Sequence, residues 1–118
     1  MDPNNEWETP FGNAKVDDEL RRTVLEIGHG WVSLDAAAHR REHSIEVQLP
    51  FLQLRRMDLR FLPICLGFSD YEITQSLAHV LVEALHACNR NDFLLIASSD
   101  MSHFVPQSTA EKMDHVAL

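Results

Sequence analysis

A short polar turn that follows an apolar run carries the side chains best suited to chemistry in this chain. Residues 93–97 are Phe-Leu-Leu-Ile-Ala, and they lead directly into Ser98-Ser99-Asp100-Met101-Ser102-His103. Open α/β folds place their chemistry where a buried strand ends. His103 can give or take a proton near neutral pH, and a neighbouring carboxylate such as Asp100 can fix its tautomer. The turn predicts an acid–base site; the alternative is a strand-end histidine that caps backbone groups.

A second polar cluster, Arg41-Glu42-His43-Ser44, opens another apolar stretch earlier in the chain. The spacing predicts that His43 lies at a helix N-terminus, where the positive end of the helix dipole keeps an imidazole neutral. A neutral imidazole can donate a hydrogen bond to a substrate. The alternative is a residue that only caps the helix. We therefore ask whether His43 and His103 share one pocket.

The other histidines have simpler interpretations. His79, Glu83 and His86 fall at i, i+4 and i+7 of a predicted helix, so they share a face that could hold a metal. A solvated polar stripe opposite the apolar face is the favoured interpretation. The remaining histidines are predicted in a turn or on solvated helix faces: His29, His39 and His115.

Several familiar catalytic patterns are excluded. A Ser-His-Asp triad within one turn is disfavoured, because near neighbours in sequence rarely point together and no nucleophile elbow is present. The sequence contains no HExxH, GxSxG, GxxxxGK[ST] or GxGxxG motif. Phosphate-cradling loops are therefore not expected.

Helices are predicted from capping residues and apolar spacing. An acidic first turn before Leu20, Val24 and Ile27 predicts a helix over 17–27 that Gly28 closes. A helix over 44–57 is predicted to be kinked or interrupted at its proline. The clearest helix spans 70–88, where a Ser-x-x-Glu capping box at 69–72 precedes one apolar face. A similar box at 108–111 predicts a last helix.

Strands are predicted over 59–66 and 93–98, and a short alternation at 31–34 is compatible with a third. With the helix over 70–88 between them, the first two predict a right-handed, parallel βαβ unit. Two such strands are too few for a parallel sheet covered on both faces. We therefore expect an incomplete α/β sheet with exposed apolar edges.

Composition narrows the class of protein. The chain has 118 residues, the size of one domain, with 18 acidic and 10 basic side chains and a net charge of −8. The electrostatic field of this negative charge repels phosphate backbones and anionic lipid surfaces, so neither nucleic acid nor membrane is an expected partner. The two cysteines form no CxxC pair, and the sequence has neither an apolar run near 18 residues nor a signal-peptide pattern. These features predict a cytoplasmic protein.

Three motifs occur in a distinctive order along the chain. They are Glu42-His43-Ser44-Ile45-Glu46-Val47-Gln48-Leu49-Pro50-Phe51, then Phe61-Leu62-Pro63-Ile64, then Ser98-Ser99-Asp100-Met101-Ser102-His103-Phe104. Together with residues 7–12 and 110–112, they closely resemble the Memo family, also called AmmeMemoRadiSam system protein B. The resemblance covers essentially the whole chain.

This resemblance implies an α/β fold with a mostly parallel sheet flanked by helices, similar to class III extradiol dioxygenases, which open catechol rings at a non-haem iron. It implies that His103 is a catalytic base and that His43 is a second catalytic residue in the same pocket. The residues expected around them are Asp100, Glu42 and Ser99.

The chain departs from the family pattern in ways that matter for chemistry. Two upstream histidine loops of the family have no counterpart here, and Ser102 stands where some Memo proteins have a cysteine metal ligand. A neutral serine is a much weaker ligand than a thiolate. We expect residues 1–118 to be a single, partial Memo-like domain. Iron or copper would bind a longer form, and neither is expected to bind well here.

The expected function is one part of a dioxygenase-like, metal-binding pocket that is not catalytic in this chain alone. Its partner would be a small molecule or a peptide. The alternative is a vestigial pocket that binds a peptide or partner protein and does no chemistry.

Overall fold

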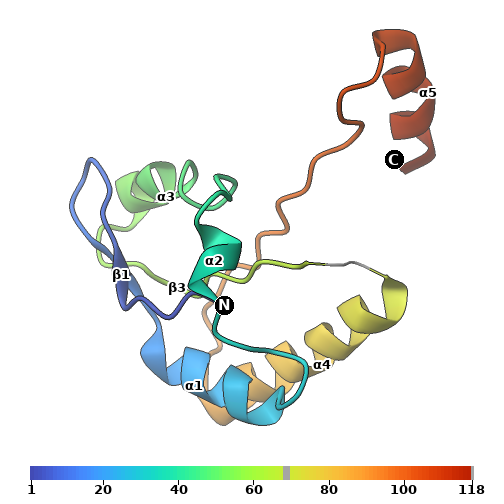
Figure 1. Cartoon of the computed structure of the whole chain (residues 1–118). Helices are drawn as coiled ribbons and strands as arrows, with labels where there is room; N and C mark the ends of the chain where they lie inside the picture. Colours follow the sequence, from blue (N-terminus) through green and yellow to red (C-terminus); the bar gives the residue numbers. More distant parts are fainter. Residues whose placement is uncertain (68–69, 118) are drawn as a thin grey trace.

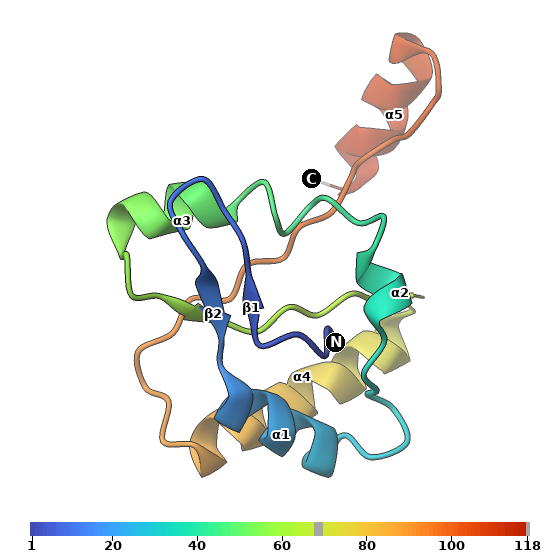
Figure 2. The same cartoon turned by 60° about the vertical axis from the view of Figure 1, so that its left-hand side comes forward.

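A computed structural model describes residues 1–67 and 70–117 of the chain. Three short strands form one sheet, and helices α1 (Asp18–Ile27) and α4 (Tyr71–Ala87) lie side by side below it (Figure 1). The last helix, α5 (Gln107–Ala117), projects away from this body at the end of an extended segment, as a view from another side also shows (Figure 2). The class is α/β, as predicted.

The sheet is mixed. Its order is β1 (Glu6–Trp7), β2 (Ala14–Val16) and β3 (Arg60–Phe61). The first pair is antiparallel and the second is parallel, with Lys15 opposite both Glu6 and Arg60. The expectation of a mostly parallel sheet is therefore not confirmed.

The predicted βαβ unit does not form in the described part of the chain. Residues 93–98 are extended but pair with no strand there, and the strand predicted over 59–66 is reduced to β3. A strand needs a neighbour to satisfy its backbone groups, and apolar composition alone does not provide one. The prediction for 31–34 is also wrong, because the amides of Trp31 and Val32 bond back to Gly28 in a turn.

Three predicted helices are confirmed, and the first two have a side-chain cap in their first turn. Helix α1 (Asp18–Ile27) begins where the Asp17 carboxylate accepts the Leu20 N–H, and α4 (Tyr71–Ala87) begins where the Asp70 carboxylate accepts the Ile73 N–H. The predicted cap at Ser69 lies outside the described residues. Helix α5 starts one residue before the predicted Ser108, because the Pro106 carbonyl accepts its first amides.

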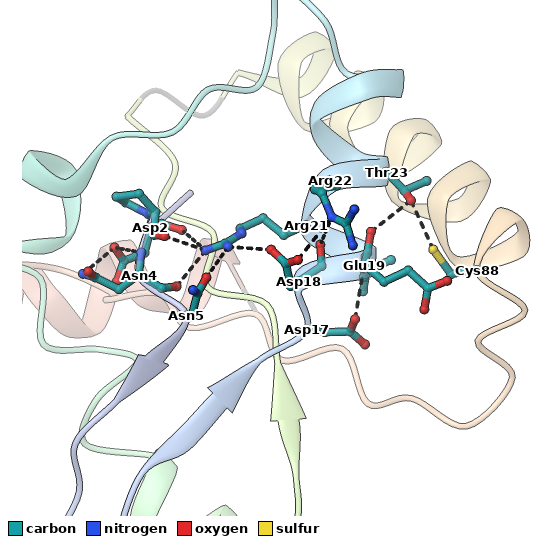
Figure 3. Close-up of polar contacts among 12 residues, drawn as sticks. Asp2, Asn4, Asn5, Asp17, Asp18, Glu19, Arg21, Arg22, Thr23 and Cys88 are labelled. Atoms are coloured by element: carbon teal, nitrogen blue, oxygen red, sulfur yellow. Dashed lines mark hydrogen bonds and ion pairs between the residues drawn. The ribbon is translucent and has the colours of Figure 1, made fainter.

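The core lies between α1 and α4. Val24 and Ala84 are fully buried against each other's helices, with Met1 beside them. Arg90, just after α4, pairs with Asp17 at the start of α1 at 3.1 Å, and Cys88 donates to the Thr23 hydroxyl. Figure 3 shows this second contact beside the polar contacts of α1. The two helices are thus joined by apolar packing and by polar bonds at one end.

The helix predicted over 44–57 is shorter than expected. Helix α3 (Leu49–Arg55) starts only at Leu49, with Pro50 in its first turn, and residues 44–48 form turns. Proline is tolerated in a first turn because the N–H that it lacks has no helical partner there. Pro50 therefore starts the helix rather than kinking it. His43 consequently lies outside the helix, and the dipole argument for its neutral form does not hold.

Candidate functional site

The polar turn at 98–104 is open to solvent and is fixed by helix α5. Ser102 is half-buried, and both its N–H and its hydroxyl donate to Asp114 Oδ1, at 2.9 and 2.6 Å. Asp114 lies on α5, so this helix holds the turn in place. The sequence analysis did not single out Asp114, since nothing in the spacing of 12 residues from Ser102 marks a contact between a turn and a helix.

His103 and Asp100 come together within this turn. The His103 Nδ1 lies 3.2 Å from Asp100 Oδ2, and both side chains are largely exposed. The imidazole stacks on the ring of Phe104, with centroids 4.5 Å apart. In the described part of the chain no hydrogen bond accompanies this contact, and the two groups form an ion pair only when the imidazole is protonated. The turn therefore brings an imidazole and a carboxylate together at the surface.

Phe104 adopts a backbone conformation that is rare for a residue with a side chain. Its φ is 52°, and its side chain is 98% exposed. Such conformations cost energy and persist where the surroundings impose them. In this conformation the Phe104 ring lies flat against His103.

A shallow hollow of about 350 Å³ lies between the turn and α5. It is lined by Ser99, Asp100, Met101, Ser102, Met113 and Asp114. Three of the predicted site residues, Ser99, Asp100 and Ser102, therefore share one wall. His43 and Glu42 are not among the lining residues.

The second predicted cluster is built on its own local contacts. His43 Nδ1 lies 2.7 Å from Glu46 Oε1, and the imidazole is otherwise largely exposed. Glu42 Oε1 accepts the Ser44 N–H at 2.7 Å, and this bond holds the pKa of the Glu42 carboxyl below its ordinary value. Among the described residues, no hydrogen bond or ion pair joins this cluster to the His103 turn. The shared pocket remains a prediction.

The described residues do not fit a metal ion. No group of three or more His, Cys, Asp or Glu side chains in this part of the chain is placed to hold one. The Ser102 hydroxyl hydrogen is directed to Asp114. The predicted stripe on α4, His79, Glu83 and His86, is exposed, which agrees with its interpretation as a solvated face.

Removing the Asp114 carboxylate tests how the turn is held. In Asp114→Ala, we expect the Ser102 amide to exchange with solvent about fivefold faster, because a hydrogen bond of this kind contributes about 1 kcal/mol. Hydrogen exchange by NMR measures this rate. Glu111→Ala on the same helix is the control, since Glu111 bonds to Gln107 and not to the turn. Equal rates in both variants would contradict the contact.

Comparison with known proteins supports the resemblance to the Memo family. The family described as Memo-like protein matches residues 2–118. A MEMO1 family protein of Aquifex aeolicus is 42% identical over 113 residues, which are 95% of this chain and 40% of that protein. One from Methanobrevibacter smithii is also 42% identical, over 96% of this chain and 39% of its own length. No solved structure matches the chain.

The chain has the small α/β architecture described above, and it belongs to the Memo family. It spans about two fifths of the length of the curated relatives that it matches. In the described part of the chain, no helix is both long enough and apolar enough to cross a membrane.

Proposed function

We propose that this chain forms one wall of a dioxygenase-like pocket and is not catalytic alone. The observation that carries the proposal is the contact of His103 with Asp100 at 3.2 Å, in the turn 98–104, which lies within the region that the family model matches. Asp100 orients the ring, and Nε2 takes a proton from a substrate hydroxyl or returns it. This is the work of a general base.

Two further groups can position a substrate in this proposal. Ser102 donates its hydroxyl hydrogen to Asp114, so its oxygen lone pairs remain available to accept a hydrogen bond. His43, oriented by Glu46, offers Nε2 on the other wall. Glu42 holds the backbone of the His43 turn through Ser44. Ser99 lines the same hollow as Asp100 and adds a hydroxyl there.

Iron or copper enters the proposal only for a longer polypeptide. The described residues provide no converging donor set, so no step here depends on a metal. The proposed ligand is a small molecule or a peptide. The net charge of −8 disfavours nucleic acid and anionic membranes as partners, and a cytoplasmic setting is consistent with two free cysteines.

A second candidate, a peptide-binding module, is favoured by one observation. Residues 93–96 are extended and apolar, yet 45–76% exposed, with Leu94 the most exposed of the four. In the described part of the chain, no strand pairs with them. An extended peptide can add to such a segment through main-chain hydrogen bonds, with side-chain pockets giving selectivity.

A catechol assay separates the two candidates. The chain is tested alone and as a chimera in which it replaces the matched region of the Aquifex aeolicus relative, each supplied with iron or copper under oxygen. We expect no ring-opened product from the chain alone. We expect turnover by the chimera that falls at least 100-fold in His103→Gln, the usual loss when a general base is removed.

Three outcomes of this assay would count against the proposal or favour the binding module. Ring opening by the chain alone would contradict the proposal that it is incomplete as a catalyst. A folded chimera without turnover would favour the binding module. Turnover that is unchanged in His103→Gln would remove His103 from the proposed role.

A further inference from the structure

His39 is buried without a hydrogen-bond partner, although the sequence predicts it on a solvated face. It is the last residue of α2 (Ala36–His39), and its side chain is 9% exposed. Neither Nδ1 nor Nε2 has a partner among the described residues. Burying a polar group without a hydrogen bond is costly, and burying it charged costs far more. The site therefore tolerates the neutral ring and opposes the cation.

The surroundings of His39 come from three parts of the chain. Trp7 on β1 meets the imidazole edge-on, with ring centroids 5.9 Å apart. The charged groups that face it are the Met1 ammonium and three carboxylates, those of Asp2, Asp35 and Glu42. Burial lowers the pKa of His39 below its ordinary value, the ammonium acts in the same direction, and the three carboxylates oppose them.

The carboxylates near His39 already have other partners. Asp2 accepts from Asn4 and from the Trp7 indole N–H. Asp35 accepts the first amides of α2, and Glu42 accepts the Ser44 amide. A protonated His39 would therefore have to displace an existing hydrogen bond or expose itself to water.

We propose that His39 is a proton-sensitive latch that holds α2, and with it the Glu42–His43 turn, against the N-terminal strap, residues 1–5. Two backbone hydrogen bonds join the strap to the segment that leads into α2. The Met1 amino group donates to the Ser33 carbonyl at 2.7 Å, and the Asp35 N–H donates to the Met1 carbonyl at 2.8 Å. The turn follows α2 directly, since the Glu42 N–H donates to the His39 carbonyl at 3.4 Å.

The direction of the pH effect follows from the neutral, buried ring. An imidazole in the detached or unfolded state has a pKa of about 6.5, above that of the docked ring. The docked state is therefore fully favoured above about pH 6.5 and loses stability as the pH falls below it. The opening equilibrium should shift by up to about tenfold per pH unit for one proton, and should level off below the folded pKa of His39.

The test follows Trp7 fluorescence in a Trp31→Phe background, where Trp7 is the single remaining tryptophan. Between about pH 7.5 and about pH 5.5, we expect its emission to shift to the red and the melting temperature to fall. His39→Phe should abolish both changes. His115→Phe, an exposed histidine on α5, should leave them in place. The Met1 amino group is the same in all variants, so it does not contribute to the difference.

NMR of the parent chain gives an independent readout. The His39 ring protons should titrate below about pH 6.5, together with the chemical shifts of the His43 amide. A His39 ring that titrates as in an unfolded peptide would overturn the latch, even if His39→Phe failed to fold. An unchanged pH dependence in a folded His39→Phe variant would overturn it as well.

Discussion

Arg21→Met is expected to lower the free energy of unfolding by about 3 kcal/mol, because it leaves a set of buried oxygens without a donor. Arg21 lies on α1 and is 6% exposed. Its guanidinium donates to the backbone carbonyls of Asp2, Pro3 and Asn4 and to the side chains of Asn5 and Asp18. Figure 3 shows the side chain extended from α1 to the N-terminal strap.

Arg22→Met is the matched control. Arg22 pairs with the same Asp18 at 3.2 Å, but its side chain is 72% exposed. An exposed ion pair contributes at most about 1 kcal/mol. Urea unfolding followed by circular dichroism gives both values. Equal losses in the two variants would show that the strap is not held by Arg21.

The Arg21 contact also predicts how acid acts on the strap. The hydrogen bond from Arg21 holds the pKa of Asp18 below its ordinary value, since the carboxylate form is the acceptor. This contribution is present above the unfolded pKa of Asp18 and is lost as the pH falls through the folded one. It therefore acts at lower pH than the His39 latch, whose loss begins near pH 6.5.

Sequence reasoning succeeded where the causes are local. Acidic caps and apolar spacing placed α1 and α4, because a helix satisfies its backbone within its own segment. It failed for the strands, whose partners are distant in sequence. Residues 93–97 have the composition of a buried strand and are exposed in this chain, because composition does not indicate which segment must lie beside them.

The same difference between local and distant contacts explains which parts of the candidate site could be predicted. The turn that carries Asp100 and His103 was identifiable because its polar residues follow an apolar run. Asp114, which holds that turn, and the buried state of His39 both depend on contacts between separate segments. The role of Arg21 could not be predicted either, since an arginine on an amphipathic helix is expected to lie in solvent. The polar residues that were missed are those whose burial or hydrogen bonds depend on a separate segment of the chain.

Leu49→Ala is expected to lower the free energy of unfolding by about 3 kcal/mol, the usual loss for a leucine truncated in a core. Leu49 is 2% exposed and is the first residue of α3. Next to it in the fold, buried Gln53 accepts from the Thr9 hydroxyl at 2.6 Å and donates to the Gly12 carbonyl at 3.3 Å. Helix α3 is thus docked on the connection between β1 and β2.

Leu54→Ala makes the same chemical change on the same helix at a side chain that is 63% exposed, and should cost less than about 0.5 kcal/mol. The difference between the two variants isolates the docking of α3 from its helix propensity. Because residues 44–48 lead from His43 into α3, Leu49→Ala should also broaden the NMR signals of the His43 turn, whereas Leu54→Ala should not. Broadening in neither variant, with the full loss of stability in Leu49→Ala, would mean that the local Glu46 contact alone orders His43.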